Sequence, residues 1–129
     1  MSFQIRFSPE TRIVTIVYFD RVDLDEKLAS ARQVGEKYGH LHPLMILVDV
    51  RRADLVLSVD ERQYFGTFVA RQPGTSHGHV AVLHAPDRNA NVVIDSAAQA
   101  EGMRILEFVT EHAALEWLTT SGSDDEGAH

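Results

Sequence analysis

The sequence predicts an α/β protein with a single five-stranded mixed sheet, mostly parallel, and four helices. Its strongest apolar run, Pro43 to Val50, is short and bounded by prolyl and arginyl residues, which is typical of a strand buried on both faces. Segments with helical spacing alternate with the later apolar runs, which indicates parallel strands joined by right-handed helical crossovers. Two alternating segments precede the first helix and predict an antiparallel hairpin at one edge.

The hairpin comes first in the chain. Phe3 to Phe7 alternates apolar and polar residues, as a half-buried strand does. Arg12 to Phe19 is apolar on both faces, which places the second strand further into the sheet. Ser8 to Thr11 between them has turn-forming composition.

Two helices begin at residue pairs typical of a capping box. Asp23 with Glu26 predicts the start of the first helix, which Gly39 ends. Ser58 with Glu61 predicts the start of the second. Residues 51–57 are expected to form the loop between the central strand and this second helix.

The second half of the chain repeats the alternation of strand and helix. His79 to Ala85 and Met103 to Val109 are the remaining predicted strands, separated by a helix from Arg88 to Glu101. Thr110 is expected to cap the last helix. Residues 121–129 are small and acidic, so we expect one domain over residues 1–120 and a disordered tail after it.

Composition excludes several classes of function. The chain has 129 residues, no cysteine and a net charge of −7, so a thiol nucleophile is excluded and nonspecific nucleic-acid binding is not expected. It contains no run of about 20 apolar residues and no signal-peptide pattern, which predicts a cytoplasmic protein without a transmembrane segment.

The motifs that identify common enzymes are missing. There is no Gly-x-Ser-x-Gly elbow and no glycine-rich nucleotide-binding loop, so we expect neither an enzyme nor a cofactor. Two His-x-His pairs, at His40 and His42 and at His77 and His79, have a spacing that metal sites use. No carboxylate completes a His-Glu-x-x-His pattern, and we predict no metal site.

Several stretches resemble STAS-like domains, the fold of anti-sigma-factor antagonists, and among them the small stand-alone bacterial STAS-like proteins grouped with CRAL-TRIO lipid-binding domains. The resembling stretches are Ile46 to Asp49, Val80 to Leu83, Met103 to Phe108 and Ala113 to Leu118. The resemblance implies a regulatory module of bacterial type that binds a protein partner. Lipid-binding relatives imply a carrier of a small apolar or lipid-like ligand as the alternative, and an unrecognised enzyme as a third.

One motif of the resembling family is missing. Anti-sigma-factor antagonists carry Asp-Ser-Ser/Thr-Gly, with a phosphorylated serine, where the helix after the central strand begins. Here the stretch runs from Asp54 to Val59 and contains no glycine. Ser58 falls near the phosphorylated position, so its phosphorylation stays open, while a partner-binding role for the same surface is expected.

The predicted partner- or anion-binding site consists of Asp49, Arg51, Arg52 and Ser58, beyond the carboxyl end of the central strand. Two arginines beside a helix N-terminus suit a carboxylate or phosphate. The alternative is structural: Ser58 caps its helix, Asp49 bonds local backbone and the arginines face water.

An apolar ligand would be expected to contact the aromatic residues of the second helix, Tyr64, Phe65 and Phe68. The same aromatic helix, or the edge hairpin, could join two copies of the chain in a homodimer. The sequence does not choose between these uses.

Overall fold

The computed structural model describes the backbone of residues 2–127 and the side chains of residues 2–120. Its elements follow the predicted order: β1 (Phe3–Ser8), β2 (Ile13–Val22), α1 (Leu24–Tyr38), β3 (Met45–Leu55), α2 (Val59–Arg71), β4 (His79–Leu83), α3 (Val92–Ala100), β5 (Arg104–Phe108) and α4 (Glu111–Gly127). The predicted α/β class, with five strands and four helices, is confirmed.

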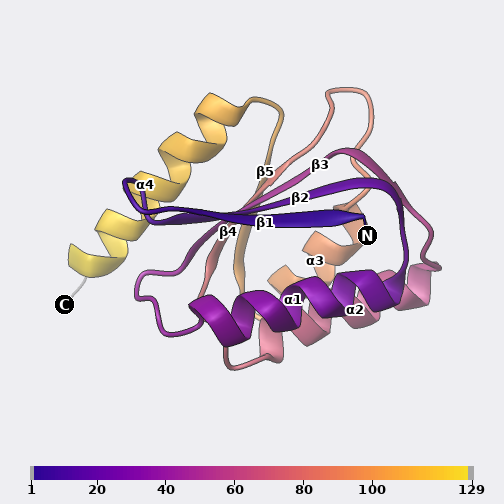
Figure 1. Cartoon of the computed structure of the whole chain (residues 1–129), viewed down its shortest axis with the longest axis horizontal. Helices are drawn as coiled ribbons and strands as arrows, with labels where there is room; N and C mark the ends of the chain where they lie inside the picture. The colour runs from indigo at the N-terminus through magenta and orange to yellow at the C-terminus, as the bar shows by residue number, and fades with distance from the viewer. Residues whose placement is uncertain (1, 128–129) are drawn as a thin grey trace.

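The five strands lie in the sheet in the order β1-β2-β3-β4-β5. β1 pairs with β2 antiparallel, and the other neighbours are parallel, as expected. Because β2 to β5 advance steadily in one direction, right-handed crossovers place α1, α2 and α3 on the same face. Figure 1 shows these three helices on one side of the sheet and α4 on the other.

Each face of the sheet has its own hydrophobic cluster. The larger cluster lies between the sheet and α1, α2 and α3, and includes Val34, Phe65 and Ile94. The smaller one lies under α4, where Ala114 and Leu118 are fully buried against strand residues. The inner helices therefore enclose most of the core, and α4 covers a smaller area.

The central strand is longer than the sequence predicts. β3 continues to Leu55, and its last residues pair with the end of β2, so the expected loop from Arg51 to Leu57 is wrong for most of its length. Ala53 and Leu55 are buried while Arg52 and Asp54 are exposed. This alternation is that of a half-buried strand. It was not predicted because two adjacent arginines interrupt the apolar pattern.

The helix boundaries also differ from the prediction in two places. α3 begins at Val92 instead of Arg88, because a turn closed by Arg88 N–H and Ala85 O precedes it. α4 continues past Thr120, where a disordered tail is expected to begin. The side chains of residues 121–129 are outside the described part, and the division at residue 120 stays a prediction.

The two predicted capping pairs have different outcomes. Ser58 Oγ accepts from Glu61 N–H and Glu61 Oε1 accepts from Ser58 N–H, which is a complete capping box. Asp23 accepts from Glu26 N–H, but the Glu26 carboxylate instead accepts hydrogen bonds from Ser2. Glu26 thus ties the N-terminal segment to α1.

α2 and α3 approach each other closely at Gly66. A Cβ atom at this position would lie 2.3 Å from the carbonyl oxygen of Ile94 and 2.8 Å from Ala97 Cβ. The small side chains of Gly66 and Ala97 therefore allow the two helices to approach each other closely.

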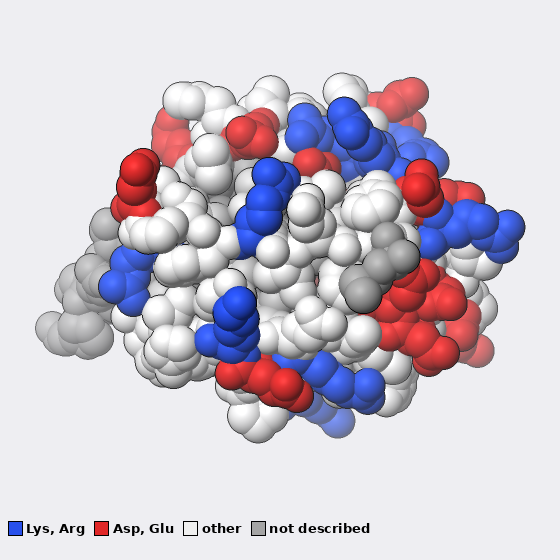
Figure 2. Space-filling model, viewed as in Figure 1, with Lys and Arg blue, Asp and Glu red and all other residues white. Residues whose placement is uncertain are grey.

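The surface in Figure 2 carries both signs of charge. Acidic side chains gather at the right-hand end of the view, where α1 begins in Figure 1, with basic side chains above them. Several basic side chains lie next to one another along the upper edge of this view. In the part of the chain that the structure describes, no helix is both long and apolar enough to cross a membrane.

Candidate functional site

A β-bulge shapes the carboxyl end of β3, where the sequence predicts a binding site. Asp49 and Arg52 pair with Val17 and Phe19 of β2, so β3 has one residue more than β2 in this interval. A bulge bends the strand and changes the direction of its side chains. It leaves both Arg51 and Arg52 exposed at the surface.

Asp49 and Arg51 form a two-point ion pair. Arg51 Nε donates to Asp49 Oδ1 at 3.1 Å and Arg51 Nη2 donates to Asp49 Oδ2 at 2.8 Å. Partial burial raises the pKa of Asp49, but the Arg51 hydrogen bonds and the charges of Arg51 and Arg52 outweigh this and lower it. The Asp49 hydrogen bonds in turn raise the pKa of Arg51.

The ion pair separates the roles of the two arginines. An anion that approached Arg51 would have to compete with the Asp49 carboxylate. Arg52 is exposed and has no ion-pair partner among the described residues. It is therefore the arginine that a ligand or partner can reach without breaking an existing contact.

Ser58 lies at the surface, three residues after the end of β3. Its hydroxyl is used by the capping box, and Arg62 holds the connection before it by donating to the carbonyl oxygens of Leu57 and Leu55, each at 3.2 Å. Val56 and Val59 on either side of Ser58 are 43% and 59% exposed. A fixed surface with two exposed apolar side chains thus surrounds the serine.

A small cavity lies in the larger core, between the sheet and the three helices that cover it. Its volume is about 50 Å³ and its walls are almost entirely apolar, with residues from β2, β3, β4, β5 and all three helices. Phe65 of α2 lines it, whereas Tyr64 is 55% exposed and stacks on Phe68 outside the cavity. The structure thus places the three predicted aromatic residues in different surroundings.

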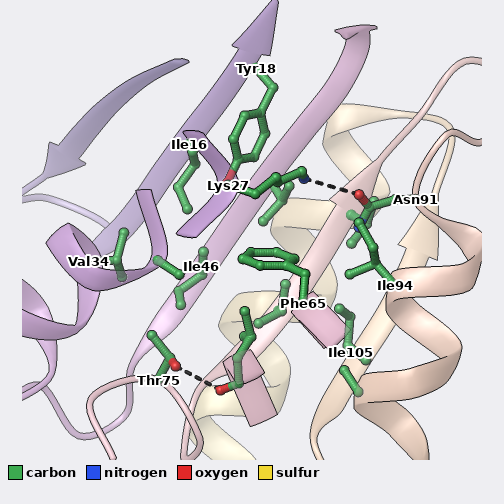
Figure 3. Close-up of a pocket in the computed structure, with 16 residues that line it drawn as sticks. Ile16, Tyr18, Lys27, Val34, Ile46, Phe65, Thr75, Asn91, Ile94 and Ile105 are labelled. Atoms are coloured by element: carbon green, nitrogen blue, oxygen red, sulfur yellow. Dashed lines mark hydrogen bonds between the residues drawn. The ribbon is translucent and has the colours of Figure 1, made fainter. Parts of the chain in front are cut away.

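The lysyl side chain of Lys27 ends at this cavity, although it is only 1% exposed. Its Nζ donates to Asn91 Oδ1 at 3.2 Å and lies 3.8 Å from the centre of the Tyr18 ring (Figure 3). Phe65 faces it from α2, with its ring centre 5.4 Å from Nζ. Burial lowers the pKa of Lys27 to about 7, against the opposing effect of the Asp95 charge.

Asn91 connects the lysine to a buried carboxyl group. Asn91 Nδ2 donates to Asp95 Oδ1 at 2.6 Å, and Asp95 is 1% exposed. Burial, which is the largest cause, and the neighbouring Glu107 carboxylate raise the pKa of Asp95 to about 9. Asp95 Oδ2 is buried without a hydrogen-bond partner. The neighbouring Asp95 in turn lowers the pKa of Glu107.

The sequence contained a signal for these buried polar residues that the site prediction did not use. Lys27 lies three residues after Leu24 and four before Ala31, within the apolar stripe of α1. Asp95 lies beside Ile94 in the stripe of α3. A charged residue at a core position is rarely buried without a specific partner, and could have been singled out for that reason.

The histidines do not gather into a metal centre. The rings of His42 and His77 stack with their centres 4.4 Å apart, and His77 Nε2 lies 3.1 Å from the carbonyl oxygen of Leu41. His79 is buried beside Trp117. Among the described residues, no three His, Cys, Asp or Glu side chains are placed to hold a metal ion.

The fold is STAS-like. It is similar to an uncharacterised protein of the DUF3478 family with a SpoIIAA-like fold from Shewanella loihica PV-4, with a TM-score of 0.60 and 14% identity over 91% of this chain and 92% of that one. It is also similar to the anti-sigma factor antagonist SpoIIAA in its unphosphorylated form, with a TM-score of 0.57 and 14% identity over 89% and 96%. No protein-family model and no curated protein matches the sequence.

Proposed function

We propose that this protein is a non-enzymatic regulatory module that binds a protein partner through the carboxyl end of β3 and the start of α2. The observation that supports the proposal most directly is the exposed pair Val56 and Val59, fixed on either side of the capped Ser58. Exposed apolar side chains on a rigid surface gain free energy when a partner covers them. Arg52 supplies a charge beside them that can orient the partner.

The likeness to an anti-sigma factor antagonist supports the same reading, because that protein acts on a regulatory partner by its name. The Asp49–Arg51 pair and the Arg62 hydrogen bonds hold the surface in one conformation. A surface fixed before binding loses less conformational entropy when the partner docks. Phosphorylation of Ser58 would place a dianion at a helix N-terminus, where negative charge is favourable, but would esterify the hydroxyl oxygen that accepts the capping hydrogen bond from Glu61 N–H.

Affinity capture with surface variants tests the docking proposal. The folded protein and its Arg52→Glu and Val59→Asp variants are used to capture proteins from a lysate of the source organism, followed by quantitative mass spectrometry. We expect a partner to be lost with both variants and kept with Leu106→Asp, a matched control because Leu106 is 45% exposed on β5. A set of captured proteins that is the same for all four forms would refute the placement.

A second candidate function, carriage of a small apolar ligand, is supported by the cavity under Phe65. Methyl NMR with 1-propanol tests whether the cavity takes such a molecule. We expect shifts of the Ile46 and Ile105 methyl signals, since both side chains line the cavity, and no shift for Ile13, which is buried under α4. Equal or absent shifts at all three methyl groups would exclude the carrier role.

A further inference from the structure

Lys27 presents an amine to the apolar cavity with few competing partners. Among the described residues its only hydrogen bond is the one to Asn91 Oδ1. An uncharged amine has two N–H groups and one lone pair, so one N–H and the lone pair stay available. The Tyr18 hydroxyl is itself bonded to Ser30, and the Thr75 hydroxyl donates to the Val69 carbonyl oxygen at 2.8 Å. Lys27 is therefore the polar group that a molecule in the cavity would meet.

The cavity limits the size and charge of that molecule. A volume of about 50 Å³ corresponds to roughly four water-sized spheres, enough for about four non-hydrogen atoms. An anionic ligand would bring a charge into apolar walls close to the Asp95 and Glu107 carboxyl groups, which is costly. A neutral molecule with an apolar body and one reactive polar atom avoids this cost.

We propose that the cavity takes a short aliphatic aldehyde or ketone and that Lys27 condenses with it to form a reversible imine. In this step the lysine nitrogen bonds to the carbonyl carbon and the carbon–oxygen bond breaks. The oxygen leaves as water with both amine hydrogens, and water reverses the step. The inference rests on the carrier role proposed above and names the chemical class of its ligand.

The charges around Lys27 favour the uncharged amine that this step requires. Burial lowers its pKa most, Asp95 of α3 opposes this and Arg62 of α2 adds to it, and the net result is a pKa of about 7. Tyr18 of β2 faces the amine as a neutral phenol, because burial raises its pKa. Lysines placed in desolvated pockets become nucleophiles towards carbonyl compounds for this reason.

The chain contains only two lysines, which makes the test specific. Lys37 is exposed at the end of α1 and sets the background rate. The folded protein is treated with propionaldehyde and sodium cyanoborohydride at neutral pH, and propyl groups are located by peptide mass mapping. We expect Lys27 to be labelled about tenfold faster than Lys37, because burial lowers the pKa of the Lys27 amine to about 7 and so provides uncharged amine at neutral pH. Labelling of Lys27 at or below the Lys37 rate, with both labelled in urea, would overturn the proposal.

A cavity-filling variant tests whether Lys27 is labelled because the aldehyde binds in the cavity or only because its amine is reactive. Val80→Ile adds one methylene to the cavity wall and leaves Lys27 in place. We expect slower labelling of Lys27 and an unchanged rate at Lys37, and Val48→Ile on the same wall repeats the test if the first variant does not fold. Unchanged Lys27 labelling in a folded variant would contradict the cavity as the site.

The carrier role and the imine can fail separately. If 1-propanol shifts the Ile46 and Ile105 methyl signals but propionaldehyde does not label Lys27, the cavity binds ligands and the imine is refuted. If neither occurs, the carrier role is refuted as well. Docking of a protein partner through the end of β3 is unaffected by either result.

Discussion

Lys27 occupies a position that the apolar spacing of α1 assigns to a hydrophobic side chain. Its four-carbon stem fills core volume beside Phe65, and its amine is bonded to Asn91. Removing the whole side chain would enlarge the cavity and leave Asn91 Oδ1 without its donor. Replacing only the amine would keep most of the packing.

We therefore expect Lys27→Ala to lower the free energy of unfolding by about 2–4 kcal/mol, through the larger cavity and the unpaired amide. Lys27→Met keeps a similar length and should cost clearly less, since a buried ionisable group is often replaced by an apolar one at little cost. Urea unfolding followed by circular dichroism measures both. Equal losses for the two variants would mean that the amine, not the packing, stabilises the core.

The residues of the predicted binding site at the end of β3 could be named from the sequence, but the ion pair between Asp49 and Arg51 could not be predicted. Asp49 and Arg51 are two residues apart, which brings them to one face only if the strand continues past Val50. Because a loop was predicted there, the ion pair was not. The bond between Lys27 and Asn91 joins residues 64 positions apart, and no local pattern indicates it.

At the scale of single elements, the start of α2 is the best-defined boundary in the predicted binding site. Ser58 and Glu61 satisfy each other's backbone N–H groups. This boundary was predictable because the capping box is a local pattern. The end of β3 was not, because its last residues form a strand only by pairing with the end of β2.

We expect Ser58→Ala to lower the free energy of unfolding by about 1 kcal/mol, since the side chain that accepts from Glu61 N–H is lost. Ser58→Asp should stay close to the wild-type stability, because aspartate also caps helices. Thermal unfolding of the three proteins checks this. An alanine variant as stable as the wild type would show that water replaces the cap.

The contact between α2 and α3 makes a second prediction at this scale. We expect Gly66→Ala to lower the free energy of unfolding by about 1–3 kcal/mol, because its Cβ would meet the backbone of α3. Gly35→Ala in α1 is the matched control. Its Cβ would meet the end of the flexible Gln72 side chain, and alanine favours helix by about 1 kcal/mol. Chemical unfolding of both variants compares them; a larger loss at Gly35 would contradict the close packing at Gly66.

At the scale of the whole molecule, the topology was predictable because the order of strands and helices, with right-handed crossovers, leaves few arrangements. The same rule places α1, α2 and α3 on one face and leaves the other for α4. The position of the cavity was not predictable. It depends on how side chains from seven elements fill one space, which no spacing in the sequence specifies.

The stability of the whole protein should depend on pH through two buried groups. The pKa of Asp95 rises from 3.8 to about 9 on folding, so its stabilisation is complete below pH 3.8 and is lost as pH rises towards 9. The pKa of Lys27 falls from 10.5 to about 7, so the unfolded chain binds its proton more strongly and stability rises with pH between 7 and 10.5. The two effects oppose each other between pH 7 and 9.

We expect the wild-type free energy of unfolding to fall from pH 4 to 7 and to change little from pH 7 to 9, where the two effects oppose each other. Asp95→Asn lacks the first effect, so its free energy of unfolding should not fall between pH 4 and 7 and should rise between pH 7 and 9. Asp49 and Glu107 have lowered pKa values, so they change the free energy of unfolding only in acid, below the usual pKa values of 3.8 and 4.5. Urea unfolding across this range measures the curves. Parallel curves for wild type and Asp95→Asn between pH 4 and 7 would contradict the buried, protonated carboxyl.

The position of α4, alone on its face of the sheet, also decides what an optical measurement would report. Trp117 is the only tryptophan in the chain, and it lies on α4 with its ring centre 5.8 Å from Phe108 and 6.4 Å from His79. Its fluorescence therefore reports the docking of α4, whereas far-ultraviolet ellipticity reports all four helices. Among the described residues, the cluster under α4 has seven buried members against 23 in the larger one. Fluorescence should consequently change at lower urea than ellipticity, and coincident curves would show that α4 and the rest of the fold unfold as one unit.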